Sequence, residues 1–136
     1  KQDIDVSYLK VADSGYANYG NVLFTTEEYL KNNPDIVKAV VQASQKGWNH
    51  YLEGTNYEKV NELIKTYNTD GDIETFNNEA VMGKDLILTG DALEQGMGAM
   101  TEARWSELQD QLIGIGELKE KTDVKEAFTT EFLAAP

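Results

Sequence analysis

The sequence contains no cysteine, and this absence excludes a disulfide framework, a thiolate metal site and a cysteine nucleophile within these residues. Histidine is nearly absent as well. His50 is the only one, so a metal site would have to be built mainly from carboxylates. No apolar run approaches the roughly 18 residues that a membrane-spanning helix needs. From these absences we expect a folded domain without metal-thiolate chemistry.

Positive charge is also in short supply. The 12 Lys and Arg side chains stand against 24 Asp and Glu side chains, which gives a formal net charge of −12. A field of this sign repels phosphate backbones and anionic surfaces, so we expect no nucleic-acid partner. The acidic residues are spread along the chain and are not gathered in a tail, which is typical of a solvated surface.

The short motifs of common catalytic sites are missing too. The sequence has no HExxH, no phosphate-cradling glycine motif and no GxSxG, and no nucleophile stands with a recognisable base. His50 falls near the end of an expected helix, where a cation is favourable, so we interpret it as a structural or surface residue. We therefore expect no enzymatic activity and no cofactor.

What the sequence does contain is the composition of one folded domain. The 136 residues are 40% hydrophobic, which suffices for one core but not for two complete domains. Strand-like segments occupy only residues 4–12 and 21–25, where β-branched and aromatic residues are bounded by Gly, Asn and Ser. We predict a single, mainly α domain over 1–136 with one or two short strands. Residues 1–25 would form a strand and crossing region, and residues 26–136 a helical region.

The clearest helix signal begins at Asn33, which can cap a helix that has Pro34 in its first turn. Apolar residues then recur at helical spacing until Gly54 ends the helix. Thr101 is an expected cap for a later helix that ends at Gly114 or Gly116. The other expected helices cover residues 26–33, 56–67, 73–88 and 123–132, with a loop at 90–100.

The two strand-like segments raise a physical difficulty. A lone strand exposes a row of unpaired backbone donors and acceptors, and one or two strands do not make a sheet of independent stability. Two explanations stay open at this point. Either a second copy or a partner supplies the missing strands, or the chain belongs to a larger protein whose sheet lies mostly elsewhere.

A stretch around Gly71 invites a calcium-loop interpretation, because Gly71 fits the central glycine and Asp70 falls at a ligand position. The ends of the loop do not fit, since the first and last ligand positions fall on Thr66 and Asn77. A cage of this kind would lack two of its strongest oxygen donors. We expect a polar turn between helices instead, with Asp72 as the cap of the next helix.

The remaining candidates for a ligand-binding site include aromatic residues. Trp48 and Trp105 each fit the apolar stripe of a helix, so both are predicted core residues. Tyr16, Tyr19 and Asn21 differ, because they lie in a turn between strand-like segments and not on a helical stripe. Tyrosine faces and hydroxyls suit ring-shaped ligands, so these three are candidate ligand-binding residues, with plain turn packing as the alternative.

Several short matches, taken in order, resemble one family. The first set consists of Tyr19-Gly20-Asn21, Val22-Leu23, Thr25-Thr26, Asn33-Pro34-Asp35 and Gly47-Trp48. Later in the chain, MGAMTEARWSELQDQLIGIGEL and DVKEAFTTEFL are similar to the late and closing segments of the same family. The sequence thus resembles solute-binding proteins of the nitrate, sulfonate, taurine and thiamine-precursor group, which serve ABC importers.

The resemblance implies a two-lobed α/β protein of the type II periplasmic-binding-protein fold, of which this chain would be the C-terminal part. It implies extracytoplasmic solute binding, in the periplasm or as a cell-surface lipoprotein. The partners would be a small-molecule solute and the membrane subunits of the transporter. Among solutes, a ring-containing one such as a thiamine pyrimidine precursor fits the tyrosine-rich turn, and a sulfonate or taurine-type solute is the other option.

In that setting Tyr16, Tyr19 and Asn21 would lie at the mouth of the cleft between the lobes. Asn21 stands where the family often has Asp, so the site would keep its hydrogen bonding and lose a charge. The rival hypothesis is a helical protein-interaction module that pairs its exposed strand with a partner or with a second copy, giving a homodimer.

Overall fold

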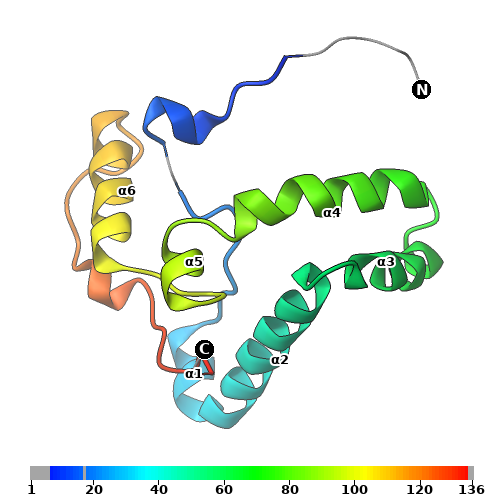
Figure 1. Cartoon of the computed structure of the whole chain (residues 1–136). Coiled ribbons are helices and arrows are strands. Elements are labelled where there is room, and N and C mark those ends of the chain that lie inside the picture. The colour runs from blue at the N-terminus through cyan, green and yellow to red at the C-terminus, as the bar shows by residue number, and fades with distance from the viewer. Residues whose placement is uncertain (1–6, 17, 135–136) are drawn as a thin grey trace.

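The computed structural model describes residues 7–16 and 18–134, and over these residues the fold is helical (Figure 1). Six α-helices and two 3-10 helices occur in this part of the chain. The α-helices are α1 (Glu27–Asn32), α2 (Pro34–Leu52), α3 (Asn56–Tyr67), α4 (Ile73–Ile87), α5 (Asp91–Gln95) and α6 (Glu102–Gly114). The 3-10 helices are η1 (Val11–Ser14) and η2 (Val124–Glu126). None of these helices combines the length and apolarity needed to cross a bilayer.

The predicted strands are wrong over the residues that can be compared. Of the first, residues 4–6 lie outside the described residues, 7–10 have no regular structure, and Val11 and Ala12 begin η1. The second, at 21–25, forms no strand either. A strand needs a ladder partner as well as favourable side chains, and the described residues offer none. The mainly α class is confirmed, without the strands.

The helix starts were predicted well, although the side chain of Asn33 makes no capping hydrogen bond at the start of α2. Thr26 accepts a hydrogen bond from the Tyr29 N–H at 3.1 Å. Asp72 accepts one from the Thr75 N–H at 2.9 Å, which confirms its predicted role as the cap of α4. Thr101 caps α6. Each cap satisfies a backbone donor that the first helical turn leaves free.

Two predictions for the second half of the chain were wrong. The expected loop at 90–100 contains α5, a helix too short to show a clear apolar period in the sequence. The expected helix at 123–132 is reduced to η2, although Asp123 caps it by accepting from the Lys125 N–H at 3.0 Å. The chain beyond η2 instead runs back across the molecule toward α2.

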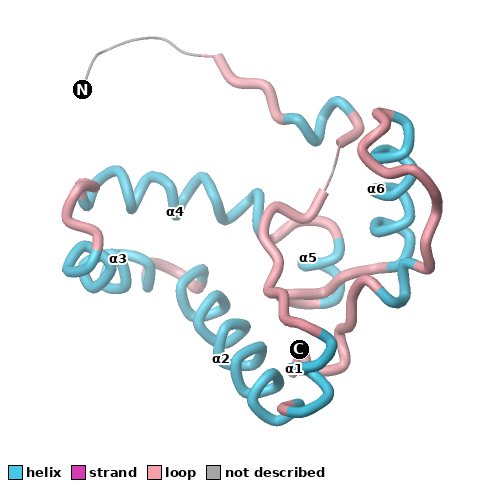
Figure 2. The backbone as a smooth tube through the Cα atoms, turned by 180° about the vertical axis from the view of Figure 1, so that it is seen from behind, coloured by secondary structure: helices cyan, strands magenta, loops and turns pink. Residues whose placement is uncertain are grey.

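The helices form two groups. Helices α1 to α4 pack each on the next in chain order, and η2 packs on α6. Figures 1 and 2 show α5 between α4 and α6 in both views, with the C-terminal end of the chain beside α1. The backbone between η1 and α1 runs past α5, so residues near the start of the chain meet helices near its end.

The core is small for a chain of this length. The buried residues in the described part are Leu52, Asn61, Ala80, Ala99 and Gln109. Trp48 is 46% exposed, so its predicted core position is wrong. By helical spacing Trp48 falls on the same stripe of α2 as the half-buried Val37 and Val41, but neighbouring elements leave this end of the stripe largely uncovered. Large apolar side chains on several helices are therefore left facing solvent.

Candidate functional site

The three residues proposed for ligand binding lie in the connection between η1 and α1 but have different surroundings. Tyr19 is half-buried, whereas Tyr16 is 42% exposed and Asn21 is exposed. Tyr16 and Asn21 form no side-chain hydrogen bond or ring contact with another described residue. The structure therefore fixes Tyr19 in place and leaves the other two side chains open to solvent.

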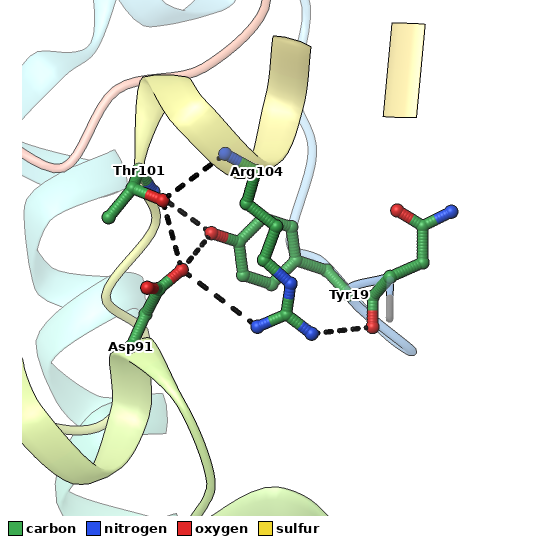
Figure 3. Close-up of polar contacts among 5 residues, drawn as sticks. Tyr19, Asp91, Thr101 and Arg104 are labelled. Atoms are coloured by element: carbon green, nitrogen blue, oxygen red, sulfur yellow. Dashed lines mark hydrogen bonds and ion pairs between the residues drawn. The ribbon is translucent and has the colours of Figure 1, made fainter. Parts of the chain in front are cut away.

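The Tyr19 hydroxyl is the centre of a polar cluster, shown in Figure 3. It donates a hydrogen bond to Asp91 Oδ2 at 2.5 Å and accepts one from the Thr101 N–H at 2.9 Å. The Thr101 hydroxyl also donates to Asp91 Oδ2, at 3.2 Å. Asp91 begins α5 and Thr101 caps α6, so a single phenol ties the two helix starts together.

Arg104 closes this Tyr19 cluster from the side of α6. Its guanidinium carbon lies 4.2 Å from the centre of the Tyr19 ring, within the range of a cation–π contact. One guanidinium nitrogen lies 3.8 Å from Asp91 Oδ2, and another donates to the main-chain carbonyl of Asn18 at 2.9 Å. The arginine thus holds both the ring of Tyr19 and the backbone just before it.

Aromatic packing supports the ring of Tyr19 as well. The Trp105 ring lies 5.8 Å from it between centroids, in a tilted arrangement. Trp105 in turn stacks on Phe128, with centroids 5.6 Å apart and an angle of 11° between the planes. Trp105 therefore packs on both rings but is only half-buried, short of the predicted core position, and its buried Nε1 has no hydrogen-bond partner in the described part of the chain.

These surroundings change the acidity of the phenol. Burial raises the pKa of Tyr19 above its usual value, and the hydrogen bond to Asp91 raises it further. The bonds from Thr101 act in the opposite direction without cancelling the effect. The hydroxyl therefore stays protonated at neutral pH and acts as a donor to Asp91 and not as a base.

Sequence reasoning found Tyr19 but missed its partners Asp91 and Arg104. Asp91 lay in a segment expected to be a loop, and Arg104 had no feature beyond its place in a helix. Thr101 was recognised only as a cap. One signal did exist, because the Met-Thr-x-x-x-Trp motif at 100–105 brackets Arg104 and was tied to the same family as the tyrosine turn.

The contacts of the cluster are suited to holding the shape of this part of the fold. Its donors and acceptors are matched to one another, and no group of three or more His, Asp or Glu residues in the described ranges could hold a metal ion. Immediately after Asn21 the backbone reaches a shallow depression of about 380 Å³, lined by Phe24, Thr25, Thr26 and Tyr29. Residues 22–25 thus form an exposed, partly apolar segment that follows the firmly held Tyr19.

Comparison with known proteins finds a family match over the first part of the chain. A model of the family described as NMT1/THI5 like matches residues 1–55. No curated protein and no solved structure matches the chain. The matched range contains Tyr16, Tyr19 and Asn21 and continues through α1 and α2. Over this first part of the chain, the match agrees with the resemblance to ABC-importer solute-binding proteins drawn from the sequence.

Proposed function

We propose that this chain is the C-terminal part of an extracytoplasmic solute-binding protein of an ABC importer. The observation that carries the proposal is the family match over residues 1–55, which covers the tyrosine turn and the helices that follow it. In this proposal the connection between η1 and α1 is a return from one lobe of a two-lobed protein to the other. The chain then has no chemistry of its own.

The exposed backbone after Tyr19 supports this assignment. Leu23 is 64% exposed and Phe24 is 94% exposed, although both are large apolar residues in a segment with a strand-like sequence. Such a segment is expected to gain a ladder partner and an apolar cover in the complete protein. A sheet contributed by the rest of a two-lobed binder would supply both.

The solute-binding residues in this proposal are Tyr16, Tyr19 and Asn21, with unequal roles. The exposed Tyr16 ring is free to stack on a ring-shaped solute, and the exposed Asn21 amide offers one donor group and one acceptor. Tyr19 contributes the edge of its ring, since its hydroxyl is already engaged by Asp91 and Thr101. A neutral Asn21 favours a thiamine pyrimidine precursor, or a sulfonate or taurine-type solute, over a strongly cationic one.

Calorimetric titration of the complete gene product tests the proposal. Pyrimidine precursors of thiamine, riboflavin, taurine and alkyl sulfonates are the ligands to add. We expect one class to bind, with Tyr16→Ala and Asn21→Ala weakening binding by roughly tenfold each, about 1.4 kcal/mol. Failure of every ligand, together with capture of a protein partner, would contradict it. The isolated chain is expected to bind weakly, because the site of such a protein lies between two lobes.

The coding region upstream of Lys1 provides an independent check of the placement. A secretory signal followed by a first α/β lobe would support an extracytoplasmic protein of this class. A start codon directly before Lys1 would show that the chain has no first lobe and would contradict the proposal.

The rival function is a helical interaction module. The observation that favours this module is the outward face of α3, where the side chains of Leu63 and Tyr67 are 59% and 85% exposed. Its strand-paired homodimer has lost its basis, because the described residues contain no strand. Sedimentation of the complete gene product with and without solute separates the two functions. Stable association with a protein partner and no response to solute would favour the module.

A further inference from the structure

The two helical groups are tied together by the last described residues of the chain. The main helix contacts stay within α1 to α4 on one side and between α6 and η2 on the other. The chain joins the groups directly through residues 88–90, between α4 and α5. Two further connections exist: residues 18–26, which Tyr19 ties to α5 and α6 and which lead into α1, and residues 127–134, which leave η2 and run back to α2 (Figure 1).

This C-terminal segment has contacts at three points along its length. Phe128 stacks on Trp105 of α6. Leu133 lies against Gly98, where a Cβ would come within 2.9 Å of Leu133 Cδ2. Gly98 also has φ +87, so glycine is needed there both for its conformation and for the space it leaves. Ala134 then reaches α2.

The contact on α2 is made by the side chain of Gln45 with the main chain of Ala134. The Ala134 N–H donates to Gln45 Oε1 at 2.9 Å, and Gln45 Nε2 donates to the Ala134 carbonyl at 3.3 Å. A glutamine amide carries a donor and an acceptor and so matches both main-chain groups of one residue. Both hydrogen bonds are exposed, so water competes for them and they can open without loss of a core.

A groove lies at this contact, between the two helical groups. One wall is a face of α2, and the other comprises Gly96 and Met97 from the connection between α5 and α6. Its volume is about 750 Å³, and Ala134 also lines it. The α2 residues that line it are Gln42, Gln45, Lys46, Asn49 and His50, and Glu53 just after the helix lines it as well.

We propose that the Gln45–Ala134 pair is a latch that holds the two helical groups together and sets the width of this groove. Opening the latch lets the α5–α6 group, with Tyr19 held on it, swing away from α2 about the short connection at 88–90 and the exposed, non-helical residues 21–25. Gly90 lies in that connection with φ 52 and ψ −126, a backbone conformation that suits glycine. The inference rests on contacts between described residues and holds whether or not the chain belongs to a solute-binding protein.

Distance measurements between spin labels on the full chain test the latch. The chain has no native cysteine, so Lys38→Cys on α2 and Glu94→Cys on α5 give two unique labelling sites at exposed positions. Gln45→Ala is expected to add a population with a longer label-to-label distance. Gln42→Ala is the matched control, because Gln42 lines the same groove and makes no hydrogen bond to a described residue. It should leave the distance distribution unchanged.

Hydrogen exchange of the Ala134 amide gives a second readout. Gln45→Ala should speed it by about tenfold or more, because local opening controls exchange. Gln45→Glu keeps an acceptor for the Ala134 N–H and loses the donor, so it should lie between wild type and Gln45→Ala. Faster exchange with an unchanged distance distribution would overturn the proposal, since the pair would then tether only the end of the chain. An unchanged exchange rate would overturn it as well.

Discussion

The hydroxyl of Tyr19 donates a hydrogen bond to Asp91, although 72 positions separate the two residues in the chain. This bond joins the connection before α1 to the start of α5. The Thr101 N–H donates to the same hydroxyl, so the start of α6 is attached to the same point. One side chain thereby holds together parts of the fold that local sequence preferences do not connect.

Replacing Tyr19 by Phe tests the strength of this attachment. The variant keeps the ring but leaves the Thr101 N–H without its acceptor and removes one of the donors to Asp91 in a part-buried site. We expect a loss of about 1–3 kcal/mol in the free energy of unfolding, measured by urea titration. Tyr16→Phe is the control, because the Tyr16 hydroxyl makes no bond to a described residue, and it should change stability little. Equal effects from the two variants would argue against the cluster.

The raised pKa of Tyr19 gives a prediction for alkaline pH. The folded chain holds the phenolic proton more tightly than the unfolded chain, in which the pKa is the usual value of 10.0. The contribution of the Tyr19 hydroxyl to the free energy of unfolding is therefore fully present below about pH 10. It is lost as the pH rises through the folded-state pKa. We expect the stability difference between wild type and Tyr19→Phe to shrink over that range. A difference that stays constant from pH 8 to about pH 11 would contradict the raised pKa.

Asn61 is the most deeply buried polar residue described, at 1% exposure. It accepts from the Tyr51 hydroxyl at 2.9 Å and donates to Asn77 Oδ1 at 2.8 Å, so it links α2, α3 and α4. Asn61→Asp keeps the shape but cannot donate when ionised, and we expect a loss of about 2–4 kcal/mol at neutral pH. Thermal unfolding measures this loss. The exposed Asn78→Asp is the control, and a loss of similar size there would show that added charge alone is responsible.

Two glycines should respond to alanine with opposite signs. A Cβ on Gly71 would overlap the Phe76 ring, so the half-buried ring must move, and we expect a loss of about 1–3 kcal/mol in the free energy of unfolding. Gly47 lies inside α2 with nothing within 4 Å of an added Cβ. Gly47→Ala should therefore raise stability by about 0.5–1 kcal/mol, because alanine favours the helix. Urea titration of both variants checks the pair, and the same sign for both would refute the argument.

Prediction from sequence succeeded where short-range chemistry decides. Pro34, Asp72 and Thr101 mark helix starts through bonds or fixed torsions within a few residues. Prediction from sequence failed at residues 21–25, which have the side chains of a strand but no neighbouring strand to pair with among the described residues. The apolar stripe of α2 was found as well, yet its period did not say how far along the helix neighbouring elements would cover it, and Trp48 remains exposed.

The sequence by itself determined the helical class, the main helix boundaries and the tyrosine turn as the place to look for a site. These follow from composition, periodicity and caps, which act over one or two helical turns. Only the tertiary structure decided that Tyr19 is held by Asp91, Thr101 and Arg104, and that Gln45 holds Ala134. Such contacts join residues many positions apart. They depend on how the helices are placed in space, and no local pattern in one sequence encodes that placement.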